Sequence, residues 1–252
     1  MSPRITLAVA SRVLIQLRRD HRTAAMLLLL PCVILTLLWW MFSDSVGGLG
    51  FDRLGPPLLA LIPFIVMFLV TSVTTLRERS SGTLERLLAM PTGKGDFLGG
   101  YAIAFGLVAA VQSVLTVLLC SLFLGLDVTG PVWMLVVVAV GDAVLGSALG
   151  LFVSAFAQTE FQAVQFLPAV VIPQILLCGL FVPRDQMPPV LEKISGVLPL
   201  SYAVDAMSSV SSTVGDAFGG VDGSVWSDLL VVIGFALGAL VLGAATLRRR
   251  TP

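Results

Sequence analysis

Residues 77–94 read RERSSGTLERLLAMPTGK and form a charged stretch between two long apolar runs. The preceding run covers residues 56–76, and the following run covers residues 97–126. A helix needs about 20 apolar residues to cross the hydrocarbon core of a bilayer, and both runs reach that length. The stretch therefore predicts a polar connection between two membrane-spanning helices.

The composition of the rest of the chain agrees with a membrane protein. Of the 252 residues, 57% are hydrophobic and 12% are charged, and the mean hydropathy is +0.99. A soluble domain usually carries about a quarter charged residues. We therefore expect an all-α polytopic membrane protein, with residues 1–252 forming a single transmembrane domain.

Six apolar segments predict six transmembrane helices, over residues 24–42, 56–76, 97–126, 132–156, 164–182 and 226–247. The first is expected to stay uncleaved, because it is longer than the apolar part of a signal peptide and no small-x-small site follows it. Residues 183–225 alternate short apolar and polar groups and predict a re-entrant outer hairpin of two short helices. The glycine pairs Gly146/Gly150 and Gly234/Gly238 predict close helix packing, either within the chain or across a dimer.

Residues 3–22 combine apolar side chains at every fourth position with five arginines. This pattern predicts an amphipathic helix lying in the membrane interface, with its apolar face toward the lipid. A basic flank that only orients the next helix is the alternative.

The basic residues predict the orientation. Twelve of the fifteen lysines and arginines lie in three regions, namely residues 3–22, residues 77–96 and the C-terminus. Six spans place these regions on one side, and the positive-inside rule makes that side cytoplasmic. Both termini and the charged stretch are therefore expected in the cytoplasm.

No catalytic or cofactor site is predicted. The sequence has no GxxxxGK[ST] phosphate-binding loop, and its one histidine, His21, lies among arginines. The three cysteines have no metal-ligand spacing and are interpreted as packing residues. We expect a protein that is not itself an enzyme.

From its own residues, the charged stretch allows two interpretations. Residues 78–88 have the spacing of a short amphipathic helix, and Pro91 ends it because proline disfavours a helical conformation in the residue before it. Such a helix between two spans can transmit a push. An ordinary solvated loop is the alternative.

The stretch resembles the cytoplasmic segment between the second and third spans of ABC-2-type transporter permeases. That family shows an acidic-basic cluster, here containing Glu78, and then G-T-x-E-x-L-x-x-x-P. These positions are occupied here by Gly82, Thr83, Glu85, Leu87 and Pro91. Residues 178–207 are similar to the family's fifth-span end and outer hairpin, at Gly179, Pro183, Pro188, Leu198, Pro199 and Tyr202. Drug exporters of the daunorubicin-resistance type look most similar.

The resemblance implies that residues 77–96 hold a coupling helix that docks on a separate ATPase subunit. The implied contacts are Glu78, Arg79, Gly82, Thr83, Leu84, Glu85, Arg86, Leu87, Leu88 and Pro91. The N-terminal helix and the connection containing Glu160 would add secondary contacts. The implied complex has two permease chains, identical or related, and two ATPase chains. It binds ATP and Mg only on the ATPase, so this chain holds no cofactor.

The resemblance also implies a transport pathway between the second and fifth spans of facing protomers. The candidate lining residues are Phe64, Phe68, Thr71, Gln165, Phe166 and Gln174. Asp142 is the one carboxylate inside a predicted span, where a charge costs at least about 2.5 kcal/mol. It is a candidate for binding a cationic substrate or relaying a proton. A neutral or hydrogen-bonded acid between helices is the alternative.

The function implied is that of the permease subunit of an ATP-driven exporter in the bacterial cytoplasmic (inner) membrane, as in multidrug efflux and antibiotic resistance. A mostly apolar interior suits an amphipathic, drug-like or lipid-like substrate. One alternative is a polysaccharide or glycolipid exporter, which 8% aromatic residues do not favour. Others are an ion-coupled secondary transporter using Asp142, and a membrane scaffold or sensor. Expected partners are the ATPase, a second permease chain and membrane lipid, but no nucleic acid.

Overall fold

The computed structural model of the chain describes residues 2–42, 50–80, 94–212 and 223–246. Over these ranges the chain is helical and contains no β-strand. Six of the described helices are long and apolar enough to cross a membrane: α2 (His21–Phe42), α3 (Phe51–Ser80), α5 (Lys94–Leu118) with the π-helix η1 (Leu119–Phe123), α6 (Val132–Ser154), α7 (Glu160–Leu177) and α10 (Gly223–Thr246). The predicted all-α polytopic membrane fold is confirmed.

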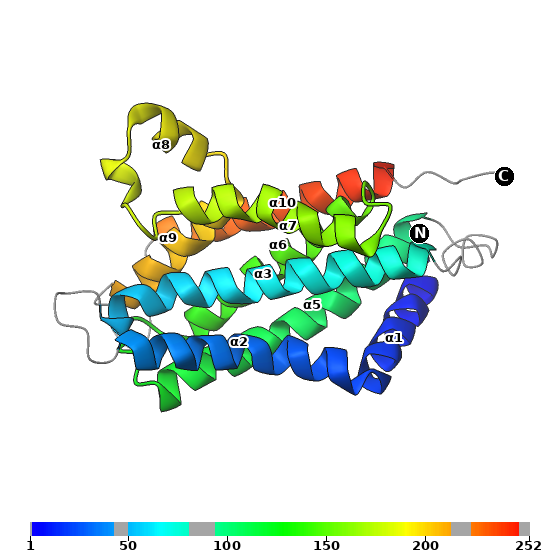
Figure 1. Ribbon diagram of the computed structural model, residues 1–252, viewed down its shortest axis with the longest axis horizontal. Coiled ribbons are helices and arrows are strands. Elements are labelled where there is room, and N and C mark those ends of the chain that lie inside the picture. The colour runs from blue at the N-terminus through cyan, green and yellow to red at the C-terminus, as the bar shows by residue number, and fades with distance from the viewer. Residues whose placement is uncertain (1, 43–49, 81–93, 213–222, 247–252) are drawn as a thin grey trace.

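The shorter helices lie at the two ends of the bundle. Helix α1 (Pro3–Arg19) runs across the ends of the long helices, at the end of the bundle where α10 finishes (Figure 1). The 3-10 helix η2 (Arg184–Gln186), α8 (Pro189–Ser195) and α9 (Pro199–Ser212) lie between α7 and α10 in the sequence. Figure 1 shows α8 projecting from the opposite end. We call these the α1 end and the α8 end.

The centre of the bundle is the contact between α3 and α6, which two glycines bring close together. A Cβ atom on Gly146 would lie 2.5 Å from the carbonyl oxygen of Phe64, and one on Gly150 would lie 2.5 Å from that of Phe68. Both glycines therefore serve packing within the chain. For Gly234 and Gly238, in contrast, no atom of another described segment lies within 4 Å of such a Cβ position.

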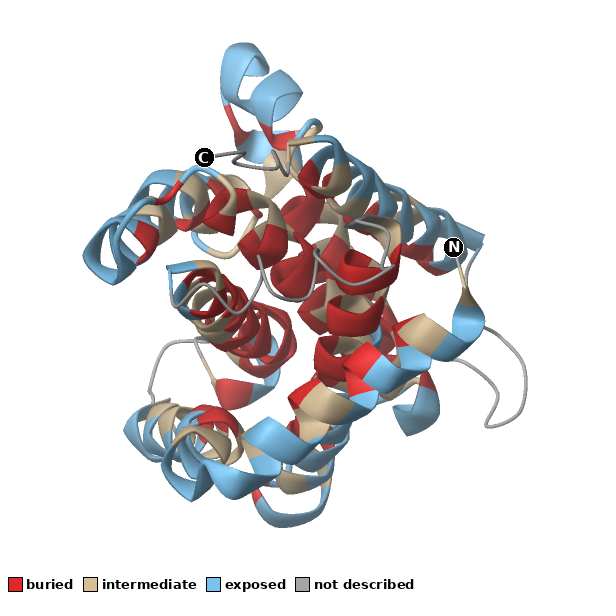
Figure 2. Cartoon of the chain, turned by 90° about the vertical axis from the view of Figure 1, so that its right-hand side faces the viewer, coloured by how far each residue is buried: buried red, intermediate tan, exposed pale blue. Residues whose placement is uncertain are grey.

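Helices α2, α7 and α10 form much of the outside of the bundle. Figure 2 shows buried residues concentrated at the centre and exposed residues on the surrounding helices. Large apolar side chains are exposed there, including Trp40, Phe161 and Val241. Such a surface is suited to contact with lipid or with another membrane helix, because the exposure of apolar side chains to water is unfavourable.

The predicted ends of several spans differ from the helix ends. The second span was expected over residues 56–76, whereas α3 covers Phe51–Ser80. The third span was expected to reach residue 126, but the helix ends at Phe123, followed by Gly125 with a φ of 64°. The fifth span was expected over residues 164–182, but α7 covers Glu160–Leu177. It begins after Thr159, whose hydroxyl accepts a hydrogen bond from the Gln162 amide, and it ends before Gly179, with a φ of 95°. Positive φ angles favour glycine and stop a helix.

Helix α1 packs its apolar side on the protein. Val9 and Val13 are buried in a cluster with residues of α5. A Cβ atom on Gly100 would lie 2.6 Å from Val9, so this glycine lets α1 approach α5 closely. Leu7 and Ile15 are exposed on the other side of α1. How that exposed side meets a membrane stays a prediction.

Candidate functional site

The candidate site lies at the α1 end, where the predicted coupling segment leaves α3 and enters α5. Residues 81–93 lie outside the described residues, and with them most of the predicted ATPase contacts. These are Gly82, Thr83, Leu84, Glu85, Arg86, Leu87, Leu88 and Pro91. The described chain shows how the two ends of the segment are held.

The first end is held by Glu78, in the last turn of α3. Its side chain is buried, with 5% of the residue exposed. The Arg12 guanidinium of α1 donates to Glu78 Oε2 at 2.6 Å, and the Tyr101 hydroxyl of α5 donates to the same oxygen. Arg12 also donates to the Tyr101 oxygen at 3.0 Å. Three helices therefore meet at one carboxylate.

The second end is held by Asp96, in the first turn of α5. Its Oδ1 atom accepts a hydrogen bond from the backbone N–H of Ser2 at 2.8 Å and from the Thr6 hydroxyl at 3.2 Å. Asp96 is buried, and Ser2 and Thr6 lie at the start of α1. Hydrogen bonds thus connect α1 to the end of α3 and to the start of α5, the two helices that flank residues 81–93.

Two more contacts fix the end of α3 to its neighbours. Arg77 donates from Nε and Nη2 to the two carboxylate oxygens of Glu160, each at 2.9 Å, at the start of α7. Arg79 donates to the backbone carbonyl of Ser154 at the end of α6. The Arg77–Glu160 pair is exposed, so it is screened by water and contributes little stability.

The buried carboxylates carry the electrostatics of this site. A carboxylate taken out of water costs several kcal/mol unless charged or hydrogen-bonding partners replace the lost hydration. Arg12 and Tyr101 supply those partners to Glu78. Glu78 and Arg79 are two of the predicted ATPase contacts. Within the described chain, Glu78 contacts α1 and α5, and Arg79 contacts the end of α6. The burial of Glu78 depends on residues far away in the sequence, and no local signal predicted it.

The predicted pathway residues differ in how far they are buried within the chain. Phe64, Phe68 and Thr71 are fully buried where α3 packs on α6. Gln174 is buried, with its amide donating to the Val170 carbonyl at 3.0 Å and its Oε1 accepting from the Leu200 N–H at 3.4 Å. Phe166 is partly buried and Gln165 is exposed on α7. Of this set, only Gln165 presents an exposed side.

Asp142 lies fully buried in α6, and neither carboxylate oxygen has a hydrogen-bond partner in the described part of the chain. Both polar atoms of the Gln112 amide, on α5, are likewise buried without a partner. Unpartnered buried polar groups are uncommon because they cost free energy. Asp142 therefore stays a candidate for a role that the single chain does not display.

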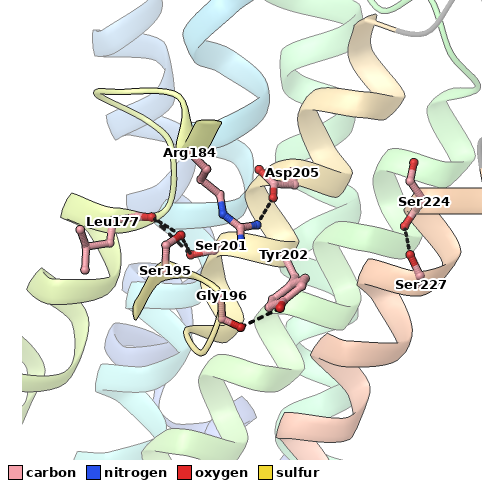
Figure 3. Close-up of polar contacts among 9 residues, drawn as sticks. All are labelled: Leu177, Arg184, Ser195, Gly196, Ser201, Tyr202, Asp205, Ser224 and Ser227. Carbon is pink, nitrogen blue, oxygen red and sulfur yellow. Dashed lines mark hydrogen bonds and ion pairs between the residues drawn. The ribbon is translucent and has the colours of Figure 1, made fainter. Parts of the chain in front are cut away.

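A second polar region lies at the α8 end (Figure 3). Arg184 forms an ion pair with Asp205, and its guanidinium lies 5.3 Å from the centre of the Tyr202 ring. The Tyr202 hydroxyl donates to the Gly196 carbonyl at 2.7 Å, and the Ser195 hydroxyl donates to the Leu177 carbonyl at 2.8 Å. These bonds fix α8 and α9 against the end of α7. A cavity of about 860 Å³ opens beside them. Sequence reasoning missed this cavity, although the acidic residues of residues 183–225 were a possible signal.

Comparisons with known proteins give one family. The family model described as "ABC-2 type transporter" matches residues 5–211. This range runs from the third residue of α1 to the next-to-last residue of α9. The chain is 27% identical over 157 residues to the probable multidrug ABC transporter permease YbhR of Escherichia coli, covering 62% of this chain and 42% of that protein. It is 24% identical over 200 residues to ABC transporter G family member 20 of Dictyostelium discoideum, covering 79% and 27%. The chain spans less than half the length of either relative.

Proposed function

Because this chain belongs to the ABC-2 type transporter family, we propose that it is the membrane-spanning permease subunit of an ATP-driven exporter. A separate ATPase, present in two copies, would supply the energy, so ATP and Mg would be bound outside this chain. A second permease chain, identical or related, would complete the complex in a bacterial cytoplasmic membrane. Both termini would lie in the cytoplasm.

The observation that carries this proposal is the attachment of α1 to both helices that flank residues 81–93, α3 and α5. A segment that docks on an ATPase has to transmit its displacement to the membrane helices. Glu78 and Asp96 link the ends of α3 and α5 to one helix through bonds to Arg12, Tyr101, Ser2 and Thr6. A push on the segment would therefore move α1, α3 and α5 together.

The glycine contact would pass that movement on to α6. Gly146 and Gly150 allow the backbones of α3 and α6 to touch, so a shift of one helix cannot be absorbed by flexible side chains between them. Arg79 joins the same two helices at the α1 end through the Ser154 carbonyl. The coupling segment and the bundle centre would form one mechanical unit.

The proposed substrate is an amphipathic or hydrophobic molecule, drug-like or lipid-like, exported from the cytoplasmic side. YbhR is named as a probable multidrug permease, and the apolar composition of this chain suits the same kind of cargo. The exposed side of α7, with Phe161, Gln165 and Ile172, would face the second permease chain. Phe64, Phe68 and Thr71 would reach the pathway only after α3 moves relative to α6.

Copurification tests the proposal. The tagged permease is expressed with the candidate ATPase encoded beside it, and the ATPase retained on the resin is measured. We expect retention by the wild type and a loss of at least tenfold in the Glu85→Ala/Leu87→Ala variant. Glu192→Ala, at the α8 end, is the matched control and should retain the ATPase fully.

Transport measurements separate the alternatives. Export that continues with an inactive ATPase and stops with a protonophore would contradict the proposal and favour an ion-coupled carrier. Asp142, with both carboxylate oxygens unpartnered among the described residues, is the observation that keeps this second function in view. In that case Asp142→Asn should abolish transport, whereas an ATP-driven exporter should keep it.

A further inference from the structure

The cavity at the α8 end has apolar walls and a charged rim. Its volume is about 860 Å³, within the range of small-molecule sites. It lies among the start of α3, the loop before α6, the loop after α7, and η2, α8 and α9. Its apolar lining consists of Leu54, Pro56, Pro57, Leu180, Pro183 and Val204. A ligand with an apolar body can therefore bury surface there.

The charges on its lining are predominantly negative. Five carboxylates and two guanidinium groups line the cavity, a formal net charge of −3: Asp52, Asp127, Asp185, Glu192, Asp205, Arg53 and Arg184. The Asp205 carboxylate is paired with Arg184, and Asp52 Oδ1 accepts from the Asp127 N–H at 3.1 Å. The lining therefore keeps a net negative charge, and the carboxylates that contribute it come from several separate segments of the chain.

Three of these carboxylates are free to meet a ligand. Asp127, Asp185 and Glu192 are exposed, and in the described ranges their carboxylates form no hydrogen bond or ion pair. The described residues also contain no group of three or more His, Cys, Asp or Glu that could hold a metal ion. The carboxylates are therefore spread around an apolar space, an arrangement that fits a bulky cation better than a metal ion.

We propose that this cavity binds an organic cation with an apolar body. The proposal rests on the exporter function above and narrows its substrate class to cationic amphiphiles, which would occupy the cavity on their way out. A cation is attracted by the net negative lining, and its apolar part contacts the proline and leucine side chains. An anion of the same shape is repelled by the same carboxylates. Since the carboxylates are exposed, binding should weaken as salt is added.

Equilibrium binding to the purified full-length permease tests this inference. The protein is placed in nanodiscs of zwitterionic lipid, and tetraphenylphosphonium is the cationic probe, with empty nanodiscs subtracted. Tetraphenylborate, an anion of nearly the same shape, is the matched probe. We expect saturable binding of the cation and at least tenfold weaker binding of the anion.

Charge-neutralising variants locate the site. Each of Asp127→Asn, Asp185→Asn and Glu192→Gln should weaken cation binding about two- to fivefold, the size expected for an exposed ion pair. The triple variant should weaken it at least tenfold. Asp20→Asn, which removes an exposed carboxylate at the α1 end, is the control and should change binding less than twofold. Equal gel-filtration profiles and melting temperatures show that the variants fold.

Two outcomes would overturn the inference. One is an unchanged cation affinity in the folded triple variant, and the other is equally tight binding of the anion. Neither outcome touches the exporter proposal, which depends on ATPase copurification. If instead the ATPase does not assemble while the cation binds in the cavity, the exporter function fails and the binding site remains.

Discussion

Glu78 is a buried carboxylate at the end of a membrane helix, and its stability depends on side chains from two other helices. Arg12→Gln removes the guanidinium that donates to this carboxylate and should destabilise the protein by about 2 kcal/mol, because a buried carboxylate that loses a charged hydrogen-bond partner is costly. The double variant Arg12→Gln/Glu78→Gln should regain much of that loss. Thermal unfolding in detergent, analysed as a double-mutant cycle, measures the coupling between the two residues.

The exposed pair at the same end supplies the comparison. Arg77→Gln removes the partner of Glu160 in water and should cost less than about 1 kcal/mol. A coupling for Arg12 and Glu78 no larger than that for Arg77 and Glu160 would contradict the view that α1 is held by a buried charge. ATPase activity of the assembled complex is a second readout, because a purely structural role would not change the number of ATP molecules consumed per substrate exported.

The Arg184–Asp205 pair predicts a pH effect at the α8 end. Burial raises the pKa of Asp205 above its usual range, and the Arg184 guanidinium opposes that rise. A carboxyl with a raised folded pKa binds its proton more tightly when folded, so stability falls as the pH rises through the window between the unfolded and folded values. Arg184→Gln removes the opposing cation and should raise this pKa further. The variant should therefore lose about 1 kcal/mol near neutral pH and regain it in acid.

Melting temperatures at about pH 7.5 and pH 5 check this expectation. The variant Arg184→Gln/Asp205→Asn has no carboxyl group at position 205. The contribution of this position to the pH dependence of the melting temperature should therefore be absent. A deficit of Arg184→Gln that is equal at both pH values would show that its packing on Tyr202, rather than its charge, stabilises α9.

At the scale of elements, the close contact between α3 and α6 depends on the absence of a Cβ atom at Gly146 and at Gly150. Gly146→Leu would place a side chain where the Phe64 carbonyl oxygen lies 2.5 Å from the new Cβ, so the backbones must separate. We expect a loss of at least about 3 kcal/mol or failure to fold, since overpacking against a backbone cannot be relieved by a rotamer change. Gly238→Leu is the matched substitution in α10, where nothing lies within 4 Å, and should cost less than about 1 kcal/mol.

Yield of monodisperse protein and its melting temperature measure this difference. If Gly238→Leu leaves the melting temperature unchanged but reduces association of the permease with itself, then the open face of α10 contacts a second chain. If Gly146→Leu folds with an unchanged melting temperature, the stability of the protein does not depend on the close approach of α3 and α6.

The sequence predicted the spans well and their contacts poorly, for a physical reason. In lipid a backbone must satisfy its own hydrogen bonds, so a long apolar run almost dictates a helix. The end of α7 was misplaced because Gly179 adopts a positive φ, which apolar composition does not reveal. The partner of α1 was also hidden. Its apolar spacing suits lipid and α5 equally well, and the bond from Arg12 to Glu78 joins residues 66 positions apart.

The whole molecule carries unlike charges at its two ends. Helix α1, the last turn of α3 and the first turn of α5 supply seven of the eleven lysines and arginines in the described ranges, whereas the lining of the cavity at the α8 end has a net negative charge. By the positive-inside rule, the proposed orientation would place α1 in the cytoplasm. The proposed ATPase contact and the proposed cation site would lie at opposite ends of α3, which begins at the cavity and ends at Glu78.

Cysteine labelling tests this orientation. In a variant with Cys32, Cys120 and Cys178 replaced by alanine, Ser11→Cys marks the exposed side of α1 and Ser212→Cys marks the end of α9. In intact cells a membrane-impermeant maleimide should label only Ser212→Cys, and disrupting the membrane should make Ser11→Cys equally reactive. Labelling of Ser11→Cys in intact cells would show that the orientation is the opposite of the one proposed. The segment after Glu78 would then face away from any cytoplasmic ATPase, and the bonds that tie it to α1 would need another explanation.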